Sequence, residues 1–337
     1  MAKFNKLFTG LMLLIGFSAS AQDIHFSQFS QAPLALNPAL TGNYSCDWRA
    51  GLNYRTQWSQ IPAPYNTYSA FFDMPVIKGI GQGDNLAAGL LITNDVSGDG
   101  NLNSLQVLAS VAYHKILGTN HFISLGVQGG LMQKSIDWQN LYFANQFDGS
   151  SFDPSLSNGE PFAGDNFNDL DLNIGLVYKG KFGKYSSVEA GGALNHLTSP
   201  NETFLDDADN ELGQRITAHT RIVIGLNQNL SIIPSVLFMT QSGAQEIVAG
   251  ADIGYYLKNP DFPATFYVGV ASRLNDALIP RIALDYKNFR LGVSYDVNNS
   301  DLQVATNSQG GLELSLIYTG CILPIVPSQY ILPCPRY

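Results

Sequence analysis

Strict alternation of apolar and polar side chains in short segments is the feature that most constrains the fold of this chain. Between Trp48 and Trp58, one parity carries Trp, Ala, Leu, Tyr, Thr and Trp, whereas the other carries Arg, Gly, Asn, Arg and Gln. A side-chain period of two is typical of a β-strand with one apolar and one polar face. The same pattern recurs at residues 170–176 and 289–297, so the chain is expected to form an extensive sheet.

Fourteen strands are predicted from this alternation. They span residues 47–58, 66–74, 85–95, 102–114, 121–135, 170–179, 186–196, 215–226, 229–241, 245–257, 265–273, 277–287, 289–298 and 310–319. Most are close to the length of about ten residues that a tilted strand needs to cross a membrane. A soluble β-sandwich alternates in the same way, but the even number of strands and the alternating short and long connections favour a membrane barrel. We therefore predict an all-β, 14-stranded antiparallel transmembrane β-barrel with short periplasmic turns and longer extracellular loops.

The lengths of the connections assign the two ends of the barrel. With the mature N-terminus in the periplasm, the periplasmic turns are residues 75–84, 115–120, 180–185, 227–228, 258–264 and 288. The three longest connections, 136–169, 197–214 and 299–309, then face outward. Lysines were not used in this assignment, yet they gather at the predicted periplasmic rim: Lys78, Lys115, Lys179, Lys181, Lys184, Lys258 and Lys287. The predicted binding surfaces are the outward loops 136–169 and 197–214, the lumen and this rim.

The chain is predicted to divide into four segments. Lys3 and Lys6 precede an apolar run that ends in small residues at 19–21, so residues 1–21 are predicted to be a secretory signal peptide. A leader at 22–46, a barrel at 47–319 and a tail at 320–337 follow, and four prolines exclude a fifteenth strand in the tail. Only 13% of residues are charged and acids outnumber bases, which suits contact with lipid in the Gram-negative outer membrane and excludes a basic surface for nucleic acid.

Apolar side chains in the leader need a surface to pack against. The leader residues singled out are Phe26, Phe29, Leu34, Asn37, Pro38 and Leu40. Asn37 is a favoured helix N-cap, Pro38 suits the first helical position and Gly42 permits a left-handed stop, so residues 37–42 are predicted to form one helical turn. We expect the leader to fold against the periplasmic mouth or into the lumen as a plug.

Both acidic and basic residues occupy the alternating strand positions that are predicted to face inward. Those predicted to face the lumen are Arg49, Arg55, Arg221, Arg281, Asp285, Arg290, Asp296 and Glu313, together with Asp171 and Asp252. A 14-stranded barrel is wide enough that the side chains of its wall need not fill it. These charges either line a passive diffusion pore or pair across the lumen to hold a plug, and the sequence leaves both alternatives open.

Three cysteines permit one disulfide and leave one thiol in an oxidising compartment. Cys46 precedes the first strand, whereas Cys321 and Cys334 follow the last, so all three are expected at the periplasmic end. Cys46–Cys334 is the favoured pairing and Cys321–Cys334 is the second choice, although spacing alone does not decide the connectivity.

Several short motifs lie in the N-terminal part of the chain: HFSQ at 25–28, NPAL at 37–40, NYR at 53–55 and QW at 57–58, with weaker matches through 135–148 and in the terminal CPRY at 334–337. With these motifs the chain resembles, over nearly its whole mature length, the PorP/SprF family of type IX secretion outer-membrane proteins. The resemblance implies an outer-membrane barrel of the type IX secretion and gliding pathway that supports export or anchoring of a secreted cargo protein. The implied partners are the C-terminal domain of a large surface adhesin, other secretion components, including periplasmic ones, and outer-membrane lipid.

Motifs of enzymes and of metal sites are not found in the sequence. It contains neither a G-x-S-x-G nor an H-E-x-x-H motif, and its five histidines are far apart. The acidic stretches at 94–101 and 206–211 lack EF-hand spacing, so solvated loops are a simpler interpretation than calcium sites. The chain is therefore not expected to be an enzyme or to hold a cofactor.

Overall fold

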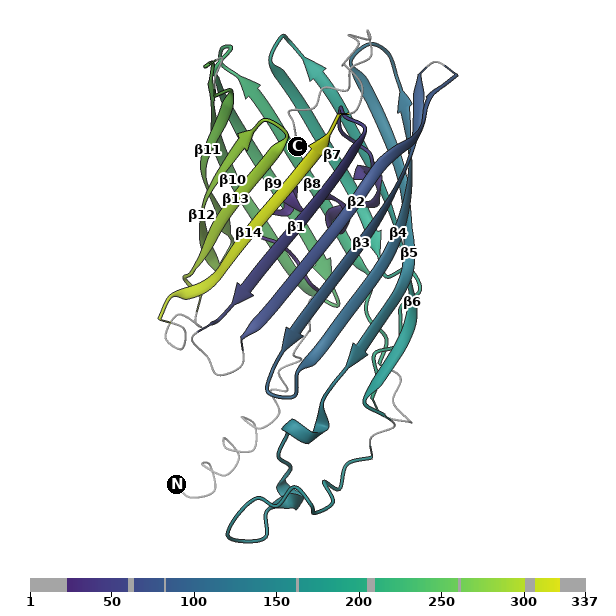
Figure 1. Ribbon diagram of the computed structural model, residues 1–337, viewed down its shortest axis with the longest axis vertical. Helices are drawn as coiled ribbons and strands as arrows, with labels where there is room; N and C mark the ends of the chain where they lie inside the picture. The colour runs from purple at the N-terminus through teal and green to yellow at the C-terminus, as the bar shows by residue number, and fades with distance from the viewer. Residues whose placement is uncertain are drawn as a thin grey trace, which may run out of the picture.

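Fourteen antiparallel strands form one closed barrel in the computed structural model (Figure 1). The structure describes residues 23–59, 64–81, 83–161, 164–204, 210–259, 262–300 and 307–321. The strands are β1 (Trp48–Gln57), β2 (Tyr65–Ile80), β3 (Asp84–Ser97), β4 (Leu102–Ile116), β5 (His121–Ser135), β6 (Asn166–Phe182), β7 (Ser186–Asn195), β8 (Arg215–Gly225), β9 (Leu230–Gln241), β10 (Ala244–Leu257), β11 (Ala264–Arg273), β12 (Ala277–Tyr286), β13 (Phe289–Asn298) and β14 (Gln309–Gly320). Each strand pairs with its neighbours in sequence, and β1 pairs with β14 to close the sheet. Closure leaves no unpaired edge, which hydrocarbon would not tolerate.

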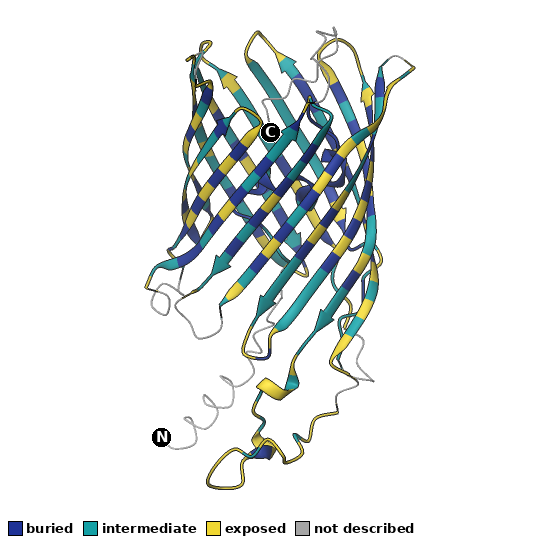
Figure 2. Cartoon of the chain, in the orientation of Figure 1, coloured by how far each residue is buried: buried dark blue, intermediate teal, exposed yellow. Residues whose placement is uncertain are grey.

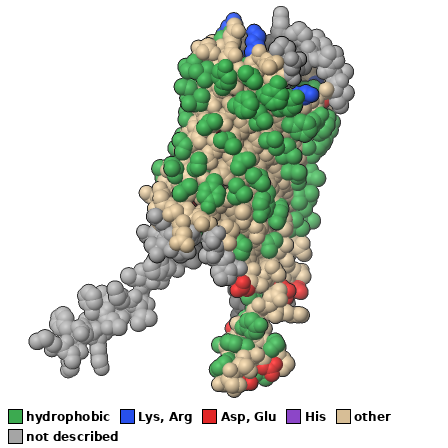
Figure 3. Space-filling view, turned by 60° about the vertical axis from the view of Figure 1, so that its left-hand side comes forward, with side chains coloured by type: hydrophobic (Ala, Val, Ile, Leu, Met, Phe, Trp, Pro, Cys, Tyr) green, Lys and Arg blue, Asp and Glu red, His purple; other side chains and the backbone are tan. Residues whose placement is uncertain are grey.

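The predicted alternation between the two faces of the sheet is confirmed (Figure 2). In β1, Arg49, Asn53 and Arg55 are buried toward the lumen, whereas Leu52 is 57% exposed on the outer face. Leu291 on β13 is also exposed on that face. Figure 3 shows hydrophobic side chains spread over the outer wall, which is the surface that lipid covers in a membrane barrel. In the described part of the chain, no helix is both long enough and apolar enough to span a membrane.

Several strands extend beyond their predicted ends, β2 and β6 by the most residues. β2 continues through Pro75 to Ile80, so most of the predicted turn 75–84 is strand. Proline cannot donate to the ladder, and the pairing of β2 with β3 accommodates it by a register shift between Pro75 and Ile77. β6 begins at Asn166, which shortens the outward connection that was expected to run to residue 169.

The leader, residues 23–46 as described, lies inside the barrel. It forms three short helical segments: η1 (Phe29–Gln31), α2 (Pro33–Leu36) and η2 (Pro38–Leu40). The predicted capped turn is confirmed as η2, where the Asn37 side chain accepts a hydrogen bond from the Ala39 amide. Asp23 contacts the outward ends of β8 and β9, whereas Tyr44 lies near the periplasmic start of β1. The described leader therefore runs through the lumen from Asp23 at the outward end to Tyr44 near the start of β1, whereas the sequence analysis placed the beginning of the leader on the periplasmic side.

The structure joins Cys46 to Cys321 rather than to Cys334. The pairing of β1 with β14 places Trp48 opposite Gly320, so the residues just beyond these positions are neighbours, with Cα atoms 4.7 Å apart. This corrects the predicted Cys46–Cys334 disulfide and also excludes the second choice. Cys334, like the rest of the tail beyond Cys321 and the predicted signal peptide, lies outside the described residues.

Candidate functional site: the leader and the lumen wall

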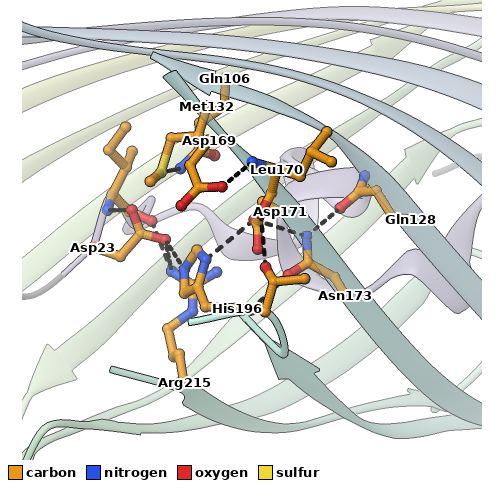
Figure 4. Close-up of polar contacts among 12 residues, drawn as sticks. Asp23, Gln106, Gln128, Met132, Asp169, Leu170, Asp171, Asn173, His196 and Arg215 are labelled. Carbon is orange, nitrogen blue, oxygen red and sulfur yellow. Dashed lines mark hydrogen bonds and ion pairs between the residues drawn. The ribbon is translucent and has the colours of Figure 1, made fainter. Parts of the chain in front are cut away.

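The outward end of the leader is held by a cluster of ionised side chains. The carboxylate of Asp23 lies 2.9 Å from Nε2 of His196 and 3.0 Å from Nη1 of Arg215 (Figure 4). His196 also faces Asp171, with 3.1 Å between Nδ1 and Oδ2. Burial would raise the pKa of Asp23, but Arg215 and His196 hold it well below its usual range. Burial likewise opposes a charged imidazole, yet hydrogen bonds to Asp171 and Asp23 raise the pKa of His196 to about 9.

The next leader residue with a charged partner is His25. Its Nε2 lies 3.1 Å from Oε2 of Glu246 on β10, and its carbonyl accepts a hydrogen bond from Arg55 on β1. Burial, together with Arg55 and Arg273, lowers the pKa of His25 well below its usual value, so this imidazole is neutral. The first residue of the HFSQ sequence thus contacts β1 and β10, two strands that are not neighbours in the wall.

Ser27 and Gln28 contact two deeply buried carboxylates of the wall. The backbone amides of both residues donate to Glu313, at 2.7 and 2.8 Å. The hydroxyl of Ser27 donates to Asp296 at 2.9 Å. Asp296 in turn pairs with Arg55 at 3.2 Å and with Arg273 at 3.0 Å. Buried charges are costly unless they are paired, and here the leader supplies part of the pairing.

Asn37 and the turn after it fit against small residues of the wall. The Asn37 amide donates to the carbonyls of Leu176 and Gly192, at 3.2 and 3.0 Å. A Cβ atom at Gly175 would overlap the Asn37 side chain, and one at Gly126 would overlap the backbone of Pro38 and Ala39. Two glycines on adjacent strands thus allow the NPAL turn to lie directly against the sheet.

The periplasmic end of the leader is fixed by Arg49 and Asp73. Arg49 binds both carboxylate oxygens of Asp73, at 3.0 and 2.7 Å, and donates to the carbonyl of Leu40. Asp73 also accepts from the amide of Gly42, and its carbonyl accepts from the Tyr44 hydroxyl. Paired hydrogen bonds between a guanidinium and a carboxylate are both strong and directional. Arg49, the second residue of β1, therefore holds the end of the leader.

Apolar leader side chains fill the spaces between these polar contacts. Phe26, Phe29, Leu34 and Leu40 are each at most 5% exposed. Phe29 and Leu40 belong to one apolar cluster with Leu237 and Met239 of β9, and Leu34 belongs to another with residues of β2, β3, β4 and β14. The leader is thus packed along its whole described length.

The structure places the predicted inward charges on the lumen wall. Arg49, Arg55, Asp285, Arg290, Asp296 and Glu313 are buried, and Arg221 and Arg281 are half-buried. Arg281 pairs with Asp252 at 2.5 Å and Arg290 with Asp285 at 3.0 Å, away from the leader. Sequence reasoning missed Asp23, His196, Arg215, Glu246, Arg273 and Asp73. All of these except Asp23 lie within predicted strands, so the alternation between inward and outward side chains was a signal that could have found them.

The seven predicted rim lysines lie at the end of the barrel that carries the shorter turns, and Figure 3 shows basic side chains at that end. Lys78 pairs with Asp47 at 2.6 Å, and Lys115 lies 3.5 Å from Asp84. Lys179 differs from the prediction, because its ammonium points into the lumen, where it pairs with Glu189 and donates to the carbonyl of Asn43. Side-chain parity explains this difference, since Lys179 shares the inward face with Asp171 and Asn173.

The longest outward connection, residues 136–161 of which are continuously described, projects beyond the barrel wall (Figure 1). It contains two short turns, η3 (Trp138–Asn140) and η4 (Ala144–Gln146). Phe147 and Phe152 form a β-bridge, and the Tyr142 ring packs at a tilt against Phe152 with ring centroids 5.5 Å apart. Tyr142 is nevertheless 71% exposed, and Phe147 and Phe152 are about half exposed. This loop is an ordered surface with uncovered aromatic side chains.

Groups of three or more side chains suited to a metal ion are not found among the residues that the structure describes. The charged clusters of the lumen instead bind one another and the leader. The chemistry of the site is therefore attachment of a peptide segment by hydrogen bonds and ion pairs.

Comparison with known proteins identifies the family. A sequence model described as the type IX secretion system membrane protein PorP/SprF matches residues 18–318. The chain belongs to the PorP/SprF family of type IX secretion system membrane proteins. Fold and family together support an outer-membrane location for this PorP/SprF barrel. Comparison with curated proteins found no match.

Solved structures with a similar fold include hydrocarbon channels and a toluene transporter. The deltaS2 mutant of the TodX monoaromatic hydrocarbon channel has a TM-score of 0.50 and 11% identity, covering 87% of this chain and 94% of that chain. The CymD monoaromatic hydrocarbon channel has a TM-score of 0.48 and 10% identity, with 88% and 94% covered, and the P. putida toluene transporter TodX has 0.48 and 11%, with 87% and 95% covered. At this identity, the first likeness shows that PorP/SprF shares the barrel fold with that channel, and it carries no information on substrate.

Proposed function

We propose that this chain is a plugged outer-membrane barrel that binds a secreted cargo protein at its outer face and supports the export or surface anchoring of that cargo. The observation that carries the proposal is the leader, which occupies the lumen from Asp23 to Tyr44 and makes hydrogen bonds to seven or more strands of the wall along its length. A lumen filled in this way suits a binding platform better than a channel for free diffusion.

Little free volume remains beside the outward half of the leader. The space between Phe29, Leu36 and Leu237 measures about 20 Å³, and the space around Asp23, Gln128 and Asn173 is of the same size. A single water molecule needs roughly 10–15 Å³, so neither space passes a nutrient molecule. The described contacts therefore support a closed lumen in the resting protein.

The proposed cargo surface is the outward loop, residues 136–161. Its exposed Tyr142, Phe147 and Phe152 are the kind of aromatic side chains that anchor protein interfaces. Asp148 and Asp153 lie beside them, and hydrogen bonds from Ser151, Ser150 and Ser155 lower the pKa of both carboxyl groups, so they are ionised at neutral pH. The family resemblance makes the C-terminal domain of a large surface adhesin the expected cargo, with other secretion components as further partners.

Co-purification from native membranes tests this function. The intact barrel is expected to co-elute with a secreted protein, and the double variant Tyr142→Ser, Phe152→Ser is expected to lose most of that protein while keeping its fold. Leu117→Ser is the matched control, because Leu117 is a 52% exposed apolar residue in a turn at the other end of the barrel. Equal recovery of cargo by the loop variant and the control would rule out this surface.

The alternative function is a passive diffusion pore, and conductance in planar bilayers separates it from the plugged platform. The intact protein is expected to be electrically quiet, and deletion of residues 23–44 is expected to open a large steady conductance. Steady openings of the same size from the intact protein would establish the pore instead.

A further inference from the structure

A short stretch of chain after β7 touches both the leader and the outward loop. We call this stretch, residues 196–204, the linking segment. At its first residue, Nε2 of His196 lies 2.9 Å from the carboxylate of Asp23 in the leader (Figure 4). At its last residue, the ring of Phe204 packs edge-on against Trp138 of the outward loop, with ring centroids 5.5 Å apart. The plug and the proposed cargo surface are therefore joined through this segment.

The linking segment runs along the outward end of β6. Four of its residues donate hydrogen bonds of 2.7–2.9 Å to that strand: the amides of His196, Leu197 and Asn201 and the hydroxyl of Thr198, with Asn173, Leu172, Asp169 and Leu170 as the respective acceptors. Two of these acceptors are side chains on the inward face of β6. The path of the segment is thus set by its contacts and by the direction in which the chain leaves β7.

That direction is set at residues with an uncommon backbone conformation. The angle φ is +59° at His196 and +45° at Ser199, in the left-handed region that L side chains rarely adopt. Such residues persist where surrounding contacts hold them, and they are frequent in segments that switch. At His196 these contacts are the ion pairs with Asp23 and Asp171. Loss of the leader removes one of the two, so the turn at His196 is expected to relax.

The other end of the linking segment belongs to an aromatic cluster at the base of the outward loop. Phe204 is the middle ring of three, because it contacts Trp138 at the start of the loop and Phe167 on β6 after the loop returns, with 5.0 Å between the centroids of the second pair. Glu202 of the segment also pairs with Lys134 at the end of β5. The segment therefore joins the two sides of the loop at its base, below the exposed aromatic side chains.

We propose that the linking segment couples the docked leader to the order of the outward loop, so that the barrel holds its cargo surface in place only while the lumen is plugged. Coupling between two sites is reciprocal: the docked leader stabilises the loop, and the ordered loop stabilises the docked leader. A partner that binds the loop in this arrangement therefore also tightens the plug. The proposal rests on the proposed function, because it gives the plug a role in preparing the surface that cargo binds.

Hydrogen exchange of the full-length protein in detergent, measured by mass spectrometry without cargo, tests the coupling from the leader to the loop. Asp23→Ala is expected to raise the exchange rate of residues 136–161 about fivefold, the lower end of the range typical for coupled sites. Asp23→Asn, which keeps one acceptor oxygen, is expected to fall between this variant and the wild type. Tyr44→Phe is the control, because it removes a leader hydrogen bond at the periplasmic end and should leave the loop unchanged.

The same measurement tests the reverse direction. Phe204→Ala is expected to raise the exchange rate of residues 23–28 about fivefold, as reciprocity requires. Tyr142→Ala is the matched control, because it removes a 71% exposed aromatic ring from the same loop without a contact to the linking segment among the described residues. Trp138→Ala, which removes the partner ring of Phe204, is expected to act as Phe204→Ala does. Heat-modifiable migration in gels checks that each barrel is folded.

A double variant checks that the coupling passes through the linking segment. With the segment already detached from the loop, Asp23→Ala combined with Phe204→Ala is expected to raise loop exchange no further than Phe204→Ala alone. Additive effects in the double variant, unchanged loop exchange in Asp23→Ala, or equal effects of Tyr142→Ala and Phe204→Ala on the leader would each overturn the proposal.

Failure of this proposal and failure of the proposed function give different results. The exchange measurements need no cargo, so uncoupled exchange in a barrel that still recovers cargo overturns the coupling and leaves the proposed function in place. Coupled exchange in a barrel that recovers no cargo supports the coupling and counts against the proposed function.

Discussion

The carboxylate of Asp23 lies 2.9 Å from Nε2 of His196, so the first described leader residue is fixed at the outward end of β7 by a charged contact in which His196 is buried and Asp23 is half-buried. Hydrogen bonds to Asp171 and Asp23, acting against burial, raise the pKa of His196 to about 9, compared with about 6.5 in an unfolded chain. A raised pKa means that this contact stabilises the docked leader fully below about pH 6.5 and that the stabilisation is lost as the pH rises through about 9. The pKa of Asp23 is lowered, so its contribution is lost only under acid conditions, below about pH 4.

Hydrogen exchange measured by mass spectrometry checks this pH dependence. After correction for intrinsic rates, residues 23–31 are expected to lose protection between pH 6.5 and pH 9.5, whereas residues 37–44 are expected to keep theirs. The variant His196→Gln should show weak protection of residues 23–31 at both pH values. A wild type and a variant with the same pH profile would show that another group controls the docking.

Gly126→Ala is expected to expel the NPAL turn from the wall. An added methyl group would overlap the backbone of Pro38 and Ala39, and neither backbone nor sheet can yield. Limited proteolysis should then cut the leader rapidly while the barrel stays intact. Gly192→Ala is the control, because the nearest atom to its added Cβ is 3.5 Å away. Equal protection of the leader in both variants would contradict the close packing of η2.

Glu313→Ala is expected to loosen the outward half of the leader. The change leaves the buried amides of Ser27 and Gln28 without an acceptor, at a cost of about 1–3 kcal/mol for each. Bilayer recordings should show brief openings that the wild type lacks, and Glu313→Gln, which keeps one acceptor oxygen, should fall between the two. A quiet Glu313→Ala barrel would mean that the remaining contacts suffice to hold the leader.

Removal of the Cys46–Cys321 disulfide is expected to destabilise the barrel by about 2–4 kcal/mol, as is typical for a bond that closes a long loop. Cys321→Ser should therefore unfold at lower urea concentration than the wild type under oxidising conditions. Cys334→Ser should unfold as the wild type does, and it should leave no free thiol for labelling. Loss of stability in Cys334→Ser instead would reinstate the pairing predicted from the sequence.

Cysteine labelling in intact cells checks which end of the barrel faces outward. In a Cys334→Ser background, Ser150→Cys on the outward loop should react with a membrane-impermeant maleimide. Lys184→Cys at the opposite end should react only after the outer membrane is permeabilised. The reverse pattern would invert the assignment of the outward loop and of the lysine rim.

The strands were predictable because each one faces two different environments. Lipid outside and polar groups inside impose a period of two that is visible at Leu170, Asp171 and Leu172 without any knowledge of the fold. Boundaries were less predictable where a strand continues beyond the hydrocarbon, as β2 does past Pro75. There apolar and polar side chains no longer alternate clearly, although the backbone hydrogen bonds between the strands continue.

The partners of the leader were not predictable from the sequence. Parity places Arg55, Asp296 and Glu313 inside, but it does not say that Ser27 meets two of them across 286 and 269 residues of sequence. That information depends on the path of the leader through the lumen. Likewise, all three cysteines were expected at one end, but only the pairing of β1 with β14 selects Cys321.

A segment that enters a closed ring of strands at one end and joins the ring at the other end constrains biogenesis. If the barrel closed first, the buried carboxylates of the wall would lack their partners in the leader. We therefore expect the sheet to form around the leader, and the β1–β14 seam, which Cys46 and Cys321 join, to close only after the leader is in place. The N-terminal segment would then serve as the template on which the wall is completed.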